Sequence, residues 1–212
     1  FHFQSLTGVD LGGRRIIKIN EFFLCNHGYE FVHLVDKSSP NANYEGCFLY
    51  RHYFRELCGR KKNFFTVLNR LGIGLQKMLK HRNRSISMEQ FQLGSAYWDI
   101  TEELAKYILY NEKLIERAFK NTNCCDEVFI QTLIWNSPYR KRLWKPYLNN
   151  GMEANMRFID FSRGENSGPY TIQKEDVFQI FKTEMLFARK FDYDKYPDAV
   201  NKVLDLLSIR DK

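Results

Sequence analysis

The feature that most constrains the fold is an alternation between short apolar runs and segments whose apolar residues recur at helical spacing. Residues 1–6 form an apolar run typical of a buried strand, and the turn-forming residues 7–13 close it. Residues 16–26 then show a helical pattern, and the aromatic and β-branched run 29–35 is typical of a strand. Because strands and helices alternate along the chain, the sequence predicts an α/β fold.

Capping residues predict two helices in the middle of the chain. Thr101 is a suitable N-cap, because its hydroxyl can accept a hydrogen bond from the first turn, and we expect one helix over residues 101–120. Asp126 is suited to cap the next helix, which residues 136–138 (Asn-Ser-Pro) should end. Glu127 is therefore expected in the first turn of that helix, where the helix dipole favours a charged carboxylate.

The last third of the chain continues the mixed pattern. Residues 156–161 predict a strand and residues 164–169 a loop, while residues 175–181 and 197–207 are typical of helices. The chain has no internal repeat and no low-complexity tract. We therefore expect residues 1–212 to form a single layered α/β domain.

The composition favours a globular domain without a membrane span. Hydrophobic residues make up 44% of the 212, and no apolar run approaches the roughly 18 residues that a spanning helix needs. The chain begins at Phe1 inside an apolar run, so we expect a fragment of a longer protein. Five cysteines, an odd number that includes the adjacent Cys124 and Cys125, favour a reducing compartment such as a bacterial cytoplasm. A Golgi lumen is the alternative.

Positive charge is concentrated in residues 51–84. This segment holds ten lysines and arginines against one acid, Glu56, whereas the whole chain has a net charge of +7. Leu68, Leu71 and Leu75 recur within it at helical spacing, which predicts an amphipathic helix. Two interpretations stay open, because such a segment is either a solvated basic face or a surface for phosphate, nucleic acid or lipid headgroups.

Five short stretches, in this order, carry a resemblance to a known family. They are Ser5-Leu6-Thr7-Gly8-Val9-Asp10-Leu11, Gly94-Ser95-Ala96-Tyr97-Trp98, Asp126-Glu127-Val128-Phe129-Ile130-Gln131-Thr132-Leu133, Arg157-Phe158-Ile159-Asp160-Phe161 and Leu186-Phe187-Ala188-Arg189-Lys190-Phe191-Asp192. Together they resemble the core-2/I-branching β-1,6-N-acetylglucosaminyltransferases and the related peptide xylosyltransferases. The resemblance implies the carboxyl-terminal part of a GT-A-like domain, a mixed sheet flanked by helices. The amino-terminal nucleotide-binding strands of the family have no counterpart in this chain.

The resemblance also assigns roles to three side chains. Glu127 matches the family's general base, which takes the proton of the acceptor hydroxyl while the nucleoside diphosphate leaves from the opposite face. Arg157 and Lys190 match a basic pair that neutralises the diphosphate, so no metal and no other cofactor is expected. By spacing alone, Glu127 would be an ordinary helix-start residue and the two cations ordinary surface charges.

Asp192 and Asp194 have the spacing with which many glycosyltransferases hold Mn²⁺ or Mg²⁺. In the family that the chain resembles, this acidic stretch follows the basic lysine and the enzymes work without metal. We therefore expect that this pair does not ligate a metal.

Three further residues are candidates for substrate contact, each with a structural alternative. Tyr97 and Trp98 could stack on the apolar face of a sugar, although aromatic residues after a Gly-Ser turn are as often core residues. Asp10 follows a predicted strand at the edge where α/β folds place ligands, and a turn-capping role is the alternative.

The resemblance implies a UDP-sugar donor and a glycan or glycoconjugate acceptor as partners. UDP-N-acetylglucosamine is the family's commonest donor, and UDP-xylose is the runner-up. Two other functions remain: a basic binding module for an anionic membrane or nucleic acid, and an inactive transferase retained for sugar binding. Among the anionic partners we expect a peripheral contact with a membrane and no nucleic acid.

Overall fold

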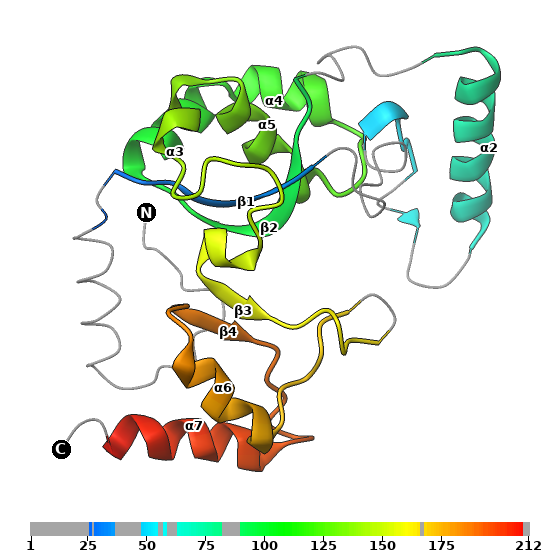
Figure 1. The fold of residues 1–212 in the computed structure, drawn as a ribbon. Helices are drawn as coiled ribbons and strands as arrows, with labels where there is room; N and C mark the ends of the chain where they lie inside the picture. The colour runs from blue at the N-terminus through cyan, green and yellow to red at the C-terminus, as the bar shows by residue number, and fades with distance from the viewer. Residues whose placement is uncertain are drawn as a thin grey trace. The chain divides into compact units, whose positions relative to one another are not determined.

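The computed structural model describes residues 26, 28–36, 48–54, 57–58, 63–81, 90–165 and 168–209. Within these residues the protein is mixed α/β, with six α-helices and two small sheets of two strands each (Figure 1). The chain divides into two compact units, which we call the central unit (Tyr29–Gly151) and the C-terminal unit (containing Met152–Lys212). None of the described helices is long and apolar enough to cross a membrane.

The elements of the central unit are β1 (Phe31–Val35), α2 (Phe64–Met78), β2 (Leu93–Asp99), α3 (Glu102–Tyr110), α4 (Glu112–Phe119) and α5 (Phe129–Trp135). The elements of the C-terminal unit are β3 (Arg157–Ile159), α6 (Val177–Lys182), β4 (Phe187–Arg189) and α7 (Pro197–Ile209). The predicted strand 1–6 and nearly all of the predicted helix 16–26 lie outside the described residues.

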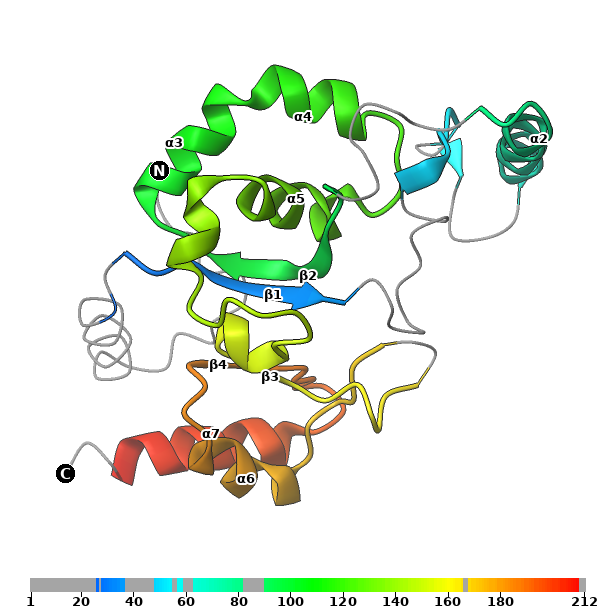
Figure 2. The ribbon, with the colours of Figure 1, turned by 45° about the horizontal axis from the view of Figure 1, so that its top comes forward.

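The central unit is built on the antiparallel pair β1–β2, and α3, α4 and α5 lie on the same side of this pair (Figures 1 and 2). Leu34 of β1, Leu104 of α3 and Ile130 of α5 are fully buried in one apolar cluster. The strand predicted at residues 29–35 is thus confirmed over Phe31–Val35, and burial of its apolar side chains against the helices holds the layer together.

An irregularity in the β1–β2 pairing, where His33 alone faces residues 95–97 of β2, brings the β1 backbone against Gly94. The register shifts between Val32 and Leu34, so His33 is left out of the regular pairing. A Cβ atom at position 94 would lie only 1.8 Å from the carbonyl oxygen of His33 and 2.8 Å from Cγ of Gln131. The absence of a side chain at Gly94 is therefore a condition for the close approach of the two strands.

The single helix expected over residues 101–120 is wrong, because two helices occupy this range. Thr101 caps α3 as predicted, accepting a hydrogen bond from the Leu104 N–H at 3.2 Å. Asn111 then ends α3 and begins α4, and its side-chain amide donates to the carbonyl of Tyr107 at 2.8 Å. Because this amide bonds the backbone locally, it competes with continuation of the helix.

Glu30 links three parts of the central unit although it is fully buried. Its backbone exchanges hydrogen bonds with Arg142 and Trp144, at 2.8 and 3.0 Å. Its carboxylate accepts from the backbone N–H and the hydroxyl of Thr101, at 2.8 and 2.7 Å, and Arg142 Nε lies 3.7 Å away. Burial raises the pKa of Glu30, while the Thr101 hydrogen bonds and the Arg142 charge act in the opposite direction.

The C-terminal unit combines the parallel pair β3–β4 with α6 and α7, which lie on one side of it (Figures 1 and 2). Ile172, Val177 and Ala199 are fully buried in its apolar cluster, and Phe158 of β3 packs against them. The predicted helices 175–181 and 197–207 are confirmed as α6 and α7, although a 3-10 turn (Lys174–Asp176) forms the start of the first one.

An ion-pair network fixes the loop that follows β3. The Asp160 carboxylate accepts from the Ser162 hydroxyl at 2.7 Å and from Arg163 Nε at 2.6 Å, and Arg163 Nη1 also donates to Asp176 at 2.8 Å. The Ser162 hydrogen bond, followed by that of Arg163, lowers the pKa of Asp160 from 3.8 to about 2. The charged form of Asp160 is therefore stabilised by folding.

Asp160→Asn is expected to lower the free energy of unfolding by about 1 kcal/mol at neutral pH, a value discounted because Arg163 is partly exposed. Since the pKa is lowered by folding, this contribution is present above pH 3.8 and is lost as the pH falls towards about 2. Urea unfolding of parent and variant at several pH values measures it. The exposed Asp194→Asn serves as the control, and an equal loss in that variant would contradict the assignment.

Candidate functional site

Glu127 lies in a tight turn that precedes α5, not in the first turn of the helix. Cys124 adopts the left-handed conformation, with φ 52° and ψ 45°, and Cys125–Glu127 form a 3-10 turn. The N–H of Glu127 donates to the Cys124 carbonyl at 3.0 Å, and that of Val128 to Cys125 at 3.1 Å. The prediction that Asp126 caps the helix is therefore wrong, because the chain closes on itself here and α5 begins only at Phe129.

The electrostatic setting of Glu127 also differs from the expectation. A carboxylate in the first turn of a helix would be stabilised in its charged form. Instead, partial desolvation of its carboxyl group raises the pKa of Glu127, although the residue as a whole is exposed, and the neighbouring Asp126 charge raises it further. A carboxylate with a raised pKa is a stronger base, which suits proton abstraction near neutral pH.

The turn that carries Glu127 lies against β2, and hydrogen bonds fasten the helix that follows it, α5, to β2 and to the residue that precedes β2. The turn contacts both β2 and α5. Gln131 of α5 donates through Nε2 to the Ser95 carbonyl at 2.6 Å, and the Thr132 hydroxyl accepts from the Gln92 N–H at 3.0 Å. Gln131 is fully buried. The stretches 94–98 and 126–133, separate in the sequence, are therefore neighbours in the fold.

Tyr97 and Trp98 lie on β2, the strand that the Glu127 turn contacts. Trp98 is opposite Val32 in the strand pairing and packs at the edge of the core cluster of the central unit. Tyr97 is half-buried, and its backbone N–H donates to the Ser95 hydroxyl at 3.1 Å. Trp98 thus contributes to packing, which is the structural alternative given for it. Asp10 lies outside the described residues.

The two predicted diphosphate ligands belong to the C-terminal unit and lie at opposite ends of its sheet. Arg157 opens β3, while Lys190 directly follows β4. Since Arg157 pairs with Phe187, Lys190 is offset from Arg157 by three residues, about 10 Å along the strands. Arg157 donates to the Asn155 carbonyl at 2.7 Å and lies 4.7 Å from the centre of the Phe187 ring, whereas Lys190 is exposed. Arg157 therefore has structural contacts of its own.

Of the two aspartates Asp192 and Asp194, Asp192 has a structural role. An oxygen of the Asp192 carboxylate accepts from the Lys195 N–H at 3.2 Å, which stabilises the turn before α7. Asp194 is exposed. Within the part of the chain that the structure describes, no group of three or more His, Cys, Asp or Glu residues is placed to hold a metal ion.

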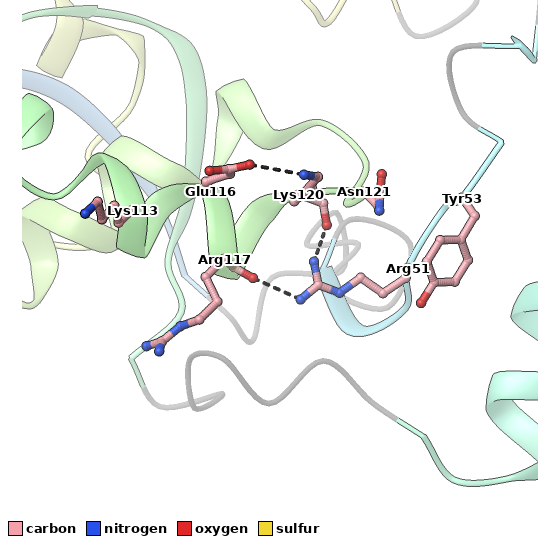
Figure 3. Close-up of a pocket in the computed structure, with 7 residues that line it drawn as sticks. All are labelled: Arg51, Tyr53, Lys113, Glu116, Arg117, Lys120 and Asn121. Carbon is pink, nitrogen blue, oxygen red and sulfur yellow. Dashed lines mark hydrogen bonds and ion pairs between the residues drawn. The ribbon is translucent and has the colours of Figure 1, made fainter.

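Sequence reasoning missed the role of Arg51 at the end of α4. An open depression of about 510 Å³ lies there, lined by Arg51, Tyr53, Lys113, Glu116, Arg117, Lys120 and Asn121 (Figure 3). Arg51 donates to the carbonyls of Arg117, at 3.0 Å, and Lys120, so it caps the negative end of the helix dipole. Its partners are 66 and 69 residues away in the sequence. The sequence alone therefore showed an excess of positive charge but not this capping role.

This basic depression is stabilised from within. Lys120 pairs with Glu116 at 3.1 Å, and the Arg51 guanidinium is directed at backbone carbonyls. Two of its cations thus have partners inside the protein, and the depression is better explained as a helix terminus than as a ligand pocket.

In comparisons with known proteins, no family model matches this chain, and no curated protein matches it significantly.

Proposed function

We propose that this protein is an inverting glycosyltransferase with a GT-A-like fold, which moves a sugar from a UDP-sugar to a hydroxyl of a glycan. N-acetylglucosamine is the proposed sugar. One observation carries the proposal: the turn with Glu127 contacts β2 and Gln131 of α5 is hydrogen-bonded to Ser95, so the two central stretches of the family resemblance, 94–98 and 126–133, are neighbours. A shared site built from both stretches requires this contact.

In the proposed reaction Glu127 acts on the acceptor. Its carboxylate takes the proton of the acceptor hydroxyl as the hydroxyl oxygen attacks the anomeric carbon. The bond from that carbon to the diphosphate oxygen breaks on the opposite face, and UDP leaves with the bonding electrons. The raised pKa of Glu127 supports this role, because it brings the basicity of the carboxylate closer to neutral pH.

Arg157 and Lys190 are proposed to stabilise the negative charge that develops on the departing diphosphate. Fixed cations can take the place of a divalent metal in this task, since guanidinium and ammonium groups donate charge-assisted hydrogen bonds to phosphate oxygens. Lys190 is exposed and so accessible to a ligand. Because Arg157 also supports β3 through Asn155 and Phe187, Lys190 gives the cleaner test of the proposal.

Saturating UDP or UDP-N-acetylglucosamine is expected to raise the melting temperature of the protein by roughly 5 °C, and EDTA should not change this. Lys190→Ala should weaken UDP binding about 10-fold, because one charge-assisted contact to the diphosphate is lost. Thermal-shift titrations with UDP, UDP-N-acetylglucosamine and UDP-xylose measure both effects and compare the donors.

The matched control is Lys182→Ala, since Lys182 is another exposed lysine of the C-terminal unit. Equal affinities of the two variants for UDP would remove Lys190 from the diphosphate site. No shift with any of the three ligands would overturn the proposed function. Binding without transfer of labelled sugar to a glycan acceptor would instead point to an inactive transferase that retains its donor site.

A further inference from the structure

Helix α2 presents an apolar stripe to the outside along its whole length. Five large apolar side chains of this helix are more than half exposed. They are Phe64 (70%), Val67 (55%), Leu71 (65%), Leu75 (53%) and Met78 (72%). Their spacing of three and four residues places them on one face, since a helix has about 3.6 residues per turn. Exposed leucines are common singly, whereas a continuous row of this kind marks an interaction surface.

The opposite face of α2 is fastened to the rest of the central unit. Gln76 is buried and exchanges two hydrogen bonds with the backbone of Arg51, at 2.9 and 3.0 Å. Asn69 is hydrogen-bonded to His52 at 3.1 Å, and Ile73 packs against a core cluster. The apolar stripe therefore cannot turn inward without breaking these contacts. Figures 1 and 2 both show α2 at the side of the central unit, apart from α3, α4 and α5.

The charged residues that the structure describes on α2 and just beyond its end are all basic. Helix α2 contains no acidic residue, and Arg70 and Lys77 are exposed on it, with Lys80 just beyond its end. The exposed aromatic residues Tyr53 and Phe54 belong to the segment on which the helix is anchored. Apolar and aromatic side chains beside a row of cations are typical of helices that lie in the headgroup region of anionic bilayers.

We propose that α2 is a docking surface for an anionic lipid bilayer, with its axis parallel to the membrane plane and its apolar stripe inserted among the lipids. A helix of 15 residues is about 22 Å long, and all five apolar side chains can reach the same interface in this orientation. Docking of this kind is peripheral, and it does not depend on the proposed transferase activity.

Charge complementarity favours a lipid surface over the other occupants. If two copies of α2 packed together, the cations of both helices would come close to one another, and α2 itself supplies no acid to pair with them. Nucleic acid would use the cations and aromatic rings, but it has no need of the aliphatic stripe Val67, Leu71, Leu75 and Met78. An anionic bilayer uses both the charge and the apolar row.

Co-sedimentation of the full chain with lipid vesicles tests the proposal. The protein should bind vesicles of mixed phosphatidylcholine and phosphatidylglycerol much more strongly than vesicles of phosphatidylcholine alone. Leu71→Gln/Leu75→Gln should weaken binding to the mixed vesicles by ~10-fold or more, because the inserted stripe loses its centre. Arg70→Gln/Lys80→Gln should weaken it by ~25-fold, at about five-fold for each cation near an anionic surface.

Matched controls replace similar residues elsewhere on the surface. Leu109→Gln/Leu204→Gln changes two exposed leucines of α3 and α7, and Lys113→Gln/Lys141→Gln removes two exposed lysines. Both should bind vesicles like the parent, and circular dichroism should show an unchanged fold for all four variants. Absence of vesicle binding by the parent, or equal losses in variants and controls, would overturn the proposal. The proposal would also be overturned if the parent formed a dimer that Leu71→Gln/Leu75→Gln dissociates. The same holds if RNA displaced the protein from the vesicles.

Discussion

Glu127→Gln is expected to lower the rate of sugar transfer by about three orders of magnitude while UDP-N-acetylglucosamine still binds with the affinity of the parent. The amide that replaces the carboxylate has nearly the same shape, but it cannot accept the proton of the acceptor hydroxyl. Because Glu127 is exposed and lies in a turn closed by backbone hydrogen bonds, the substitution should leave the fold intact. Transfer of labelled sugar and calorimetric titration of the donor measure the two quantities.

The pH dependence of transfer gives a second readout for the same residue. A base must be deprotonated to act, so activity should fall as the pH drops through the pKa of Glu127, which lies above the ordinary value of 4.5. Asp126→Asn is the matched control, because it removes the neighbouring charge that helps to raise this pKa. It should keep turnover and move the acid limb of the profile to lower pH. Near-normal turnover of Glu127→Gln would exclude Glu127 as the base. So would a pH profile of Asp126→Asn whose acid limb lies at the same pH as that of the parent.

Elements governed by local chemistry could be predicted from the sequence. Thr101 caps α3 because the N-cap hydrogen bond joins residues only three apart. The end of α5 before Pro138 was equally local, since proline cannot continue a helix. The apolar spacing around Leu71 predicted α2, because that spacing reflects a helical face whatever the face contacts.

Features set by backbone conformation or by distant partners could not be predicted in this way. The left-handed conformation of Cys124 changes the start of α5, and cysteine has no special preference for that conformation. Asn111 divides a continuous amphipathic pattern by a single side-chain hydrogen bond. Glu30 pairs with Thr101 across 71 residues, so an acid in an apolar run gave no hint of its buried carboxylate network.

The candidate site could be predicted from the sequence only in part, for the same reason. The resemblance singled out Glu127 and β2, and the hydrogen bond from Gln131 to Ser95 joins the two stretches. The raised pKa of Glu127 was not foreseen, since it follows from desolvation and from Asp126 once the expected helix start is replaced by a turn. The resemblance suggested a basic pair, but the parallel register sets Arg157 and Lys190 about 10 Å apart along the strands.

Gly94→Ala is expected to destabilise the protein by about 3 kcal/mol or more. The new Cβ would lie 1.8 Å from the His33 carbonyl oxygen, so β1 and β2 must move apart. The Gln131 side chain, with Cγ at 2.8 Å, would have to shift as well, and with it the hydrogen bond to Ser95. Urea unfolding followed by circular dichroism measures the loss.

Gly72→Ala provides the matched control, because it adds the same methyl group in α2 with nothing within 4 Å. Alanine has the higher helix propensity and restricts the unfolded chain, so this variant should be about 1 kcal/mol more stable than the parent. The geometry thus requires that Gly94→Ala lowers the free energy of unfolding and that Gly72→Ala raises it. If Gly94→Ala unfolds at the same urea concentration as the parent, the His33 carbonyl does not lie close against Gly94. The close pairing of β1 and β2 would then not be what supports the Glu127 turn.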